Sequence, residues 1–163
     1  SPVWKVLLVR SCLMFIIYFA LLSYYFGYRF EYYGIKRLAS IPDLMSLVVP
    51  FLLSVIFLGT VIGLLIPRKE LSTLIVILTS LPLVFSAGFI WPTSNIPVVI
   101  NMMAQFFPST PAINGFLRLN QMGDSLENLV QIRMQLWSLV CLYAMISYVL
   151  MTKKQQNLLK SIL

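Results

Sequence analysis

The 163-residue sequence contains no histidine, only two cysteines and only five acidic residues. Without histidine there is no imidazole general base, no Ser-His-Asp triad and no His-based metal site. Cys12 and Cys141 lie inside apolar runs, where cysteine behaves as a small apolar residue, so no disulfide is expected. We therefore expect no catalytic, cofactor-binding or metal-binding residue on this chain, and we do not expect an enzyme.

Charge of either sign is scarce as well. Charged residues make up 10% of the chain and hydrophobic residues 60%, whereas a soluble domain carries about 25% charged residues. This composition predicts a protein embedded in a lipid bilayer. The formal charge of +7 is explained by cytoplasmic loops and anionic lipid headgroups, so no nucleic-acid partner is expected.

Four apolar runs approach or exceed the length that crosses a bilayer, about 20 residues. They are residues 11–28, 44–66, 71–91 and 126–151. Ser40 followed by Asp43 is typical of a helix start, and residues 124–127, Asp-Ser-Leu-Glu, resemble a capping box. The predicted fold is an all-α polytopic helical membrane protein, a single transmembrane domain over residues 1–163.

Between the third and fourth runs lies a segment that hydropathy alone explains badly. Residues 96–107 are apolar but too short to cross. The prolines that bracket them are Pro92, Pro97, Pro108 and Pro111. A second short piece, residues 111–121, places Asn114, Arg118 and Gln121 on one helical face. We expect two short re-entrant or interfacial helices within residues 95–121, because broken backbone at membrane depth persists only in protein or beside a watery cavity.

The distribution of Lys and Arg predicts the orientation. One side would carry both termini and the loop at residues 67–70; its basic residues are Lys5, Arg10, Arg68, Lys69, Lys153, Lys154 and Lys160. The longer segments on the other side hold Arg29, Lys36, Arg37, Arg118 and Arg133. The denser side is predicted to be cytoplasmic, with Arg68, Lys69 and Glu70 as part of that face. Residues 152–163 alternate Lys with Leu and Ile and predict an amphipathic tail along the inner interface.

No acidic residue lies in the middle of a predicted crossing. The five are Glu31, Asp43, Glu70, Asp124 and Glu127. Ion-coupled carriers usually need an intramembrane carboxylate or histidine, so a proton-driven antiporter is disfavoured. No Walker-type glycine loop is present either. The chain is therefore not expected to hydrolyse a nucleotide by itself.

Gly59 and Gly63 form a GxxxG pair within the second run. Such a pair lets another helix approach closely. Packing within the chain is favoured over dimerisation as its role.

The motif at residues 86–92, Ser-Ala-Gly-Phe-Ile-Trp-Pro, is followed by Pro97 and then by Pro-Ser-Thr-Pro at residues 108–111. In this order the motifs resemble the membrane subunit of type-2 ABC exporters. The stretches 112–116 and 120–123 also resemble the bacterial drug-export branch of that family. Since family members usually have six spans, the four runs would correspond to the third through sixth, and we expect this chain to be the C-terminal portion of a longer permease.

The resemblance implies an ATP-driven export permease of the bacterial inner membrane. Its partners would be a second permease subunit, as a homodimer or heterodimer, and an ABC ATPase that holds ATP and Mg²⁺; a periplasmic adaptor is also possible. The gate residues would be Phe89, Pro92, Pro97, Asn114 and Arg118. Two alternatives stay open, a membrane scaffold that transports nothing and part of a secondary carrier.

Overall fold

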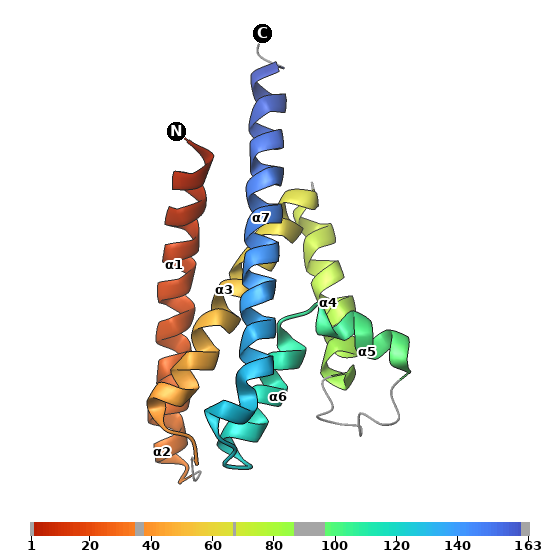
Figure 1. Ribbon diagram of the computed structural model, residues 1–163. Coiled ribbons are helices and arrows are strands. Elements are labelled where there is room, and N and C mark those ends of the chain that lie inside the picture. The colour runs from red at the N-terminus through yellow and green to blue at the C-terminus, as the bar shows by residue number, and fades with distance from the viewer. Residues whose placement is uncertain (1, 35–37, 67, 87–96, 161–163) are drawn as a thin grey trace.

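The computed structural model describes residues 2–34, 38–66, 68–86 and 97–160 (Figure 1). Within these ranges the regular elements are all helices and no strand occurs. Three helices are long and apolar enough to cross a membrane, Val3–Arg29, Ile41–Leu65 and Leu126–Asn157. The chain is therefore an all-α, multi-pass membrane protein, as its composition predicted.

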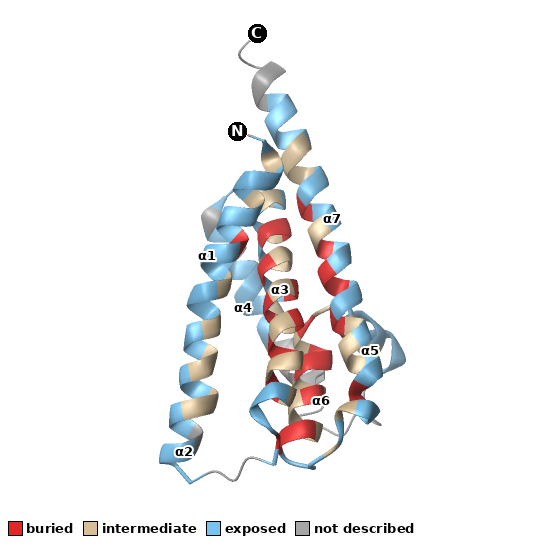
Figure 2. Cartoon of the chain, turned by 60° about the vertical axis from the view of Figure 1, so that its left-hand side comes forward, coloured by how far each residue is buried: buried red, intermediate tan, exposed pale blue. Residues whose placement is uncertain are grey.

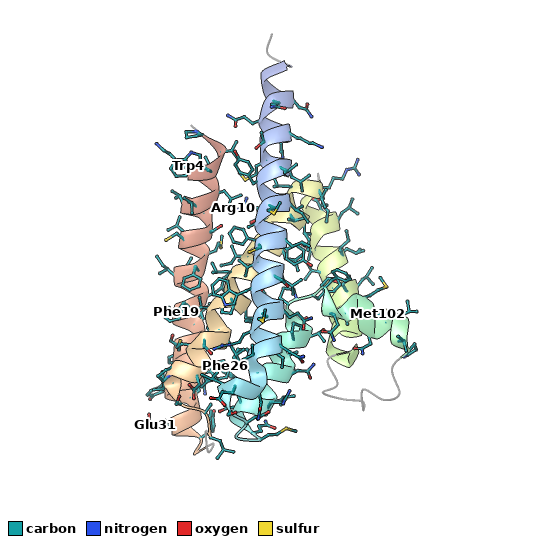
Figure 3. All side chains as sticks on the ribbon, in the orientation of Figure 1. Trp4, Arg10, Phe19, Phe26, Glu31 and Met102 are labelled. Carbon is teal, nitrogen blue, oxygen red and sulfur yellow. The ribbon has the colours of Figure 1, made fainter. Side chains whose placement is uncertain are left out.

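The first crossing consists of helix α1, Val3–Ser23, and the π-helical turn η1, Tyr24–Arg29. The short helix α2, Phe30–Tyr32, follows it. The crossing starts well before the predicted residue 11. The predicted crossing began directly after Arg10, the last charged residue before the apolar run. Lys5 and Arg10 do not interrupt the helix, so α1 begins before its uncharged part. Figure 3 shows Arg10 in the half of α1 near its start and Glu31 beyond the opposite end.

The second crossing is α3, Ile41–Leu65, which begins where the sequence signal placed it. The Ser40 hydroxyl accepts a hydrogen bond from the Asp43 backbone N–H at 3.4 Å, which satisfies one of the unpaired donors of the first turn. Pro50, buried in the middle of α3, has no N–H to donate to the carbonyl of Ser46. In Figure 1 α3 runs obliquely behind α7.

Helix α4, Lys69–Ser86, follows at the edge of the bundle. It covers most of the predicted third run, residues 71–91, whose last residues lie outside the described part of the chain. A crossing by the third run therefore stays a prediction. The start of α1, the end of α7 and the start of α4 lie toward the same end of the bundle (Figure 1). This agrees with the grouping that the Lys and Arg distribution suggested.

The last crossing begins with a 3-10 turn, η3, Leu126–Leu129, and continues as α7, Val130–Lys160. The tail is helical as far as Lys160, as predicted, but it is the end of α7 and not a separate helix. No Gly or Pro occurs between residues 152 and 160, so nothing in the sequence stops the helix after the apolar part. The predicted turn onto the inner interface is absent from the described residues.

The core lies where α3, the short helix α6 (Ser109–Asn120) and α7 meet, and Figure 2 shows buried positions on all three. Its buried members are Ala39, Leu44, Leu47, Ala112, Leu119, Leu129 and Leu136. By contrast, Ser11 is the one described residue of α1 that is buried. Most apolar side chains of α1 are exposed and thus face lipid or another protein, while the α3–α6–α7 unit forms the buried core.

Candidate functional site

The segment between α4 and α7 forms two short helices, as the proline pattern predicted. Helix α5, Val98–Gln105, and α6, Ser109–Asn120, are joined by Phe106–Pro108. Pro97 stands at the N-cap of α5 and Pro108 at that of α6. A proline at these positions lacks only an N–H that would be unpaired in any case. We call α5, α6 and their connection the half-helix pair.

The connection of the half-helix pair is held by side chains of α7. The Gln135 Nε2 donates to the backbone oxygen of Gln105 at 3.2 Å and to its Oε1 at 2.8 Å. The Tyr143 hydroxyl donates to the backbone oxygen of Phe106. The last carbonyls of a helix have no donor within the helix, and in a membrane no water replaces it. Gln135 and Tyr143 of α7 therefore supply hydrogen bonds to the backbone at the end of α5.

A further polar side chain of α7 contacts α3. Ser147, fully buried, donates to the backbone oxygen of Phe57 at 3.1 Å. Gln135, Tyr143 and Ser147 follow one another at intervals of eight and four residues and so lie on one face of α7. Sequence reasoning missed all three. Their signal was available, since polar residues at helical spacing within an apolar helix usually face the protein interior.

Helix α6 lies close to α3 and α7 at Gly115, which has no side chain. A Cβ atom on Gly115 would lie 3.2 Å from Ile132 Cγ2 and 3.2 Å from Leu47 Cδ1. These distances are shorter than ordinary van der Waals contacts between carbon atoms, about 3.5–4.0 Å. Gly115 thus allows α6 to lie close to α3 and α7 at the same time.

The end of α6 is closed by a charged cluster. The Arg118 guanidinium contacts Asp124 Oδ2 at 2.6 Å through Nη2 and at 3.0 Å through Nε. Asp124 Oδ1 accepts from the Asn128 amide at 2.7 Å and from the Ser125 N–H at 3.0 Å. The predicted capping box at residues 124–127 is therefore wrong. Ser125, not Asp124, is the N-cap of η3, and its side chain makes no capping hydrogen bond. The Asp124 carboxylate bonds to Arg118 and Asn128 instead.

This cluster gives a testable dependence on pH. Hydrogen bonding from Asn128 is the largest effect and lowers the pKa of Asp124 from its ordinary value of 3.8; desolvation raises it, and hydrogen bonds from Arg118 and the Ser125 N–H lower it further, so the net shift is downward. A carboxyl with a lowered pKa stabilises the fold above its unfolded pKa, and the stabilisation is lost as the pH falls through the folded pKa. We expect Asp124→Asn to lower the thermal midpoint at pH 7, and the difference from the natural protein to shrink below about pH 4.

Glu127→Gln is the matched control for that experiment, because Glu127 is an exposed acid three residues further along. It should leave the midpoint unchanged at both pH values. A difference for Asp124→Asn that stays constant from pH 7 to pH 3 would contradict the role given to the carboxylate.

The structure brings together only part of the predicted gate. Asn114 and Arg118 both lie half-buried on α6 and Pro97 lies exposed at the start of α5. Arg118 contacts Asp124 beyond the end of α6. Phe89 and Pro92 lie outside the described residues. Figure 3 shows Met102 on α5, which is 64% exposed and points away from α7; this side of α5 faces lipid or a partner.

The two glycines predicted to pack helices are open. Gly59 and Gly63 are exposed, and no atom of the described residues lies within 4 Å of a Cβ built on either. No helix of the described part of the chain covers them, so packing within the chain, the favoured role, finds no partner there. Arg68 and Glu70 are exposed beside the start of α4, and of Lys69 only the backbone is described.

Comparison with known proteins adds one match. The family model described as "ABC-2 family transporter protein" matches residues 1–150 of the chain. No curated protein and no solved structure matches.

Proposed function

Because the chain belongs to the ABC-2 family of transporter membrane proteins, we propose that it is a permease subunit of an ATP-driven exporter of the bacterial inner membrane, in the drug-export branch. It forms part of the substrate path together with a second permease subunit. ATP and Mg²⁺ are held by a separate ABC ATPase, and a periplasmic adaptor completes some exporters of this kind.

The observation that carries the proposal is the attachment of the half-helix pair to α7. A plain membrane anchor needs no broken helices, whereas a substrate path does, because irregular backbone at membrane depth must be buried in protein or line a cavity. Here Gln135 and Tyr143 supply the hydrogen bonds that the broken backbone requires. The half-helix pair is a preformed unit held to α7 by these hydrogen bonds.

Two hydroxyls at the start of α6 support a gate with a second arrangement. The Oγ of Ser109 and the Oγ1 of Thr110 are buried without a hydrogen-bond partner in the described structure. Each such group costs about 1–3 kcal/mol. A rearrangement of the α5–α6 connection that pairs these hydroxyls would recover this free energy, so the connection is a suitable place for the outer gate.

The positions of the acidic residues support ATP-driven export over a secondary carrier. Asp43 lies in the first turn of α3, Glu70 in the first turn of α4, and Asp124 and Glu127 precede α7. None of the described acidic side chains lies in the middle of a crossing, where a coupling ion would be bound.

Purification of the full-length permease with its neighbours tests the proposal. We expect an ABC ATPase to co-purify in mild detergent, and vesicles containing both to export substrate only with ATP. A preparation without an ATPase, or uptake driven by a pH gradient without ATP, would overturn it. The scaffold alternative is tested by Pro97→Ala and Asn114→Ala. If the chain is a permease, both variants should reduce export; if it is only a scaffold, export by the assembled complex should stay unchanged.

The open glycines give a test of the second subunit. Gly59→Leu combined with Gly63→Leu should leave the thermal stability of the separated subunit nearly unchanged, because both side chains would enter open space. If the second permease subunit packs on this face, the same variant should lose subunit association in size-exclusion chromatography. Unchanged association would show that the two subunits meet elsewhere.

A further inference from the structure

An apolar groove of ≈ 350 Å³ lies between α3 and the first crossing, which contributes residues of α1 and η1. Its lining is Tyr18, Leu21, Leu22, Tyr25, Phe51, Leu52, Val55 and Ile56. Leu52 and Ile56 are buried and form the floor, while Tyr18, Leu21 and Val55 at the rim are exposed. The described residues thus leave a groove whose floor is covered and whose rim is open.

Aromatic rings lie beside the groove. The Phe26 ring of η1 lies tilted at 5.6 Å from Phe116 of α6, and Phe116 meets Phe51 of α3 edge-on at 6.1 Å. Phe51 is also part of the groove lining. These rings connect η1 to α3 through α6 next to the groove.

The size of the groove limits what fits. Small-molecule sites usually have volumes of about 300–1,000 Å³, so ≈ 350 Å³ takes a slender ligand. A helix with its side chains is about 10–12 Å across, and it is too wide to fill such a groove. The lining is almost entirely apolar carbon, which favours a hydrocarbon chain.

A cation lies about one helical turn beyond the groove lining. Arg29 follows the lining residue Tyr25 by four residues within the π-helical turn η1 and is exposed. Its Nη1 donates to the Tyr33 hydroxyl at 2.9 Å, and its guanidinium lies over the Tyr33 ring at 5.6 Å. Within the described part of the chain no carboxylate pairs with Arg29, since the ion pair found there is Arg118 with Asp124.

We propose that the groove between α1 and α3 binds one acyl chain of a glycerophospholipid, whose phosphate lies against Arg29. The arrangement matches such a lipid part by part. The apolar floor takes the chain, Tyr25, one turn from Arg29, lies where chain and headgroup meet, and the guanidinium pairs with the phosphate. The inference requires only that the chain lies in a bilayer, and it is independent of ATP-driven export.

Photolabelling tests the proposal. The full-length permease is reconstituted in phosphatidylethanolamine vesicles containing phosphatidylglycerol with a diazirine at mid-chain, irradiated, digested and analysed by mass spectrometry. We expect the label to concentrate on the peptides with Leu22 and Leu52, which line the groove, rather than on exposed apolar positions outside it. Val55→Trp, which fills the groove from its rim, should reduce that labelling about tenfold, equivalent to ~1.4 kcal/mol.

Ile16→Trp is the matched control, because Ile16 is exposed on α1 and lies outside the groove lining. It should leave the labelling unchanged. Arg29→Gln should reduce labelling at the groove, and inorganic phosphate should not compete, since the acyl chain supplies the binding.

Three results would overturn the proposal. The first is a label spread evenly over α1 and α4 and unaffected by Val55→Trp, which shows ordinary contact with bulk lipid. The second is efficient cross-linking of Val55→Cys to a second subunit, which shows that protein covers the groove. The third is displacement of the label by inorganic phosphate, which shows an anion site without a bound chain.

Discussion

Gln135→Leu is expected to loosen the half-helix pair and to raise the hydrogen-exchange rates of the α5 and α6 amides by roughly tenfold to a hundredfold. The substitution removes the donor of two hydrogen bonds and leaves the Gln105 backbone oxygen and Oε1 without their α7 partner. An unsatisfied buried acceptor costs about 1–3 kcal/mol, and each 1.4 kcal/mol is a factor of ten in an opening equilibrium. Hydrogen exchange followed by mass spectrometry measures this opening directly.

Gln131→Leu provides the matched control, because it is the same substitution one turn earlier on the same helix, at an exposed position. It should leave exchange in α5 and α6 unchanged. Tyr143→Phe should act in the same direction as Gln135→Leu, since it removes the donor to the Phe106 oxygen. Tyr148→Phe, at an exposed tyrosine, should not. Equal exchange in Gln135→Leu and Gln131→Leu would contradict the anchoring role.

The features predicted correctly from the sequence are those that depend on neighbouring residues. Ser40 caps α3 through the N–H of Asp43, three residues away. Pro97 precedes α5 as predicted, because a proline ring acts on its own backbone and on the residue before it; the second short helix was predicted from residue 111, but α6 begins at Ser109, directly after Pro108. Long apolar runs also predicted the three crossings that are found, because bilayer thickness sets their length.

The features that the sequence did not predict depend on residues far apart in the chain. Gln135 meets Gln105 across thirty residues, and Ser147 meets Phe57 across ninety. No local pattern identifies such partners. The capping box failed for a related reason: the carboxylate of Asp124 had a competing partner in Arg118, which the turn after α6 brings close. That turn depends on Gly123, whose φ of 65° is in the left-handed region that favours glycine.

The glycines also show that sequence spacing did not predict tertiary contacts. Gly59 and Gly63 are open, whereas Gly115 makes close contacts. A GxxxG pair suggests close helix packing, yet its neighbours in the described chain are absent. Gly115, without a partner glycine in such a motif, is the position where three helices meet closely. Spacing within a helix shows which residues share a face, but the tertiary arrangement decides which face is covered.

Gly115→Leu is accordingly expected to destabilise the bundle most strongly among the glycine substitutions. Even a Cβ atom would lie 3.2 Å from both Ile132 and Leu47, and Leu adds three further carbons at a site without space. Overpacking of this kind costs about 1–3 kcal/mol or more. Gly115→Ala should cost less, because the contacted atoms are the ends of flexible side chains. Thermal unfolding in detergent, followed by circular dichroism, measures both effects.

Gly59→Leu is the matched control, since the same side chain added at Gly59 enters open space and glycine is the weaker helix former. It should leave the midpoint of the separated subunit unchanged or raise it. Leu47→Ala combined with Gly115→Leu should recover part of the loss, because the methyl carbons that meet the new side chain are removed; the double-mutant cycle then gives a coupling energy of opposite sign to the single losses. A loss in Gly115→Leu that Leu47→Ala only deepens would mean that α6 is held by contacts other than this one, and the close packing at Gly115 would not be what positions the half-helix pair.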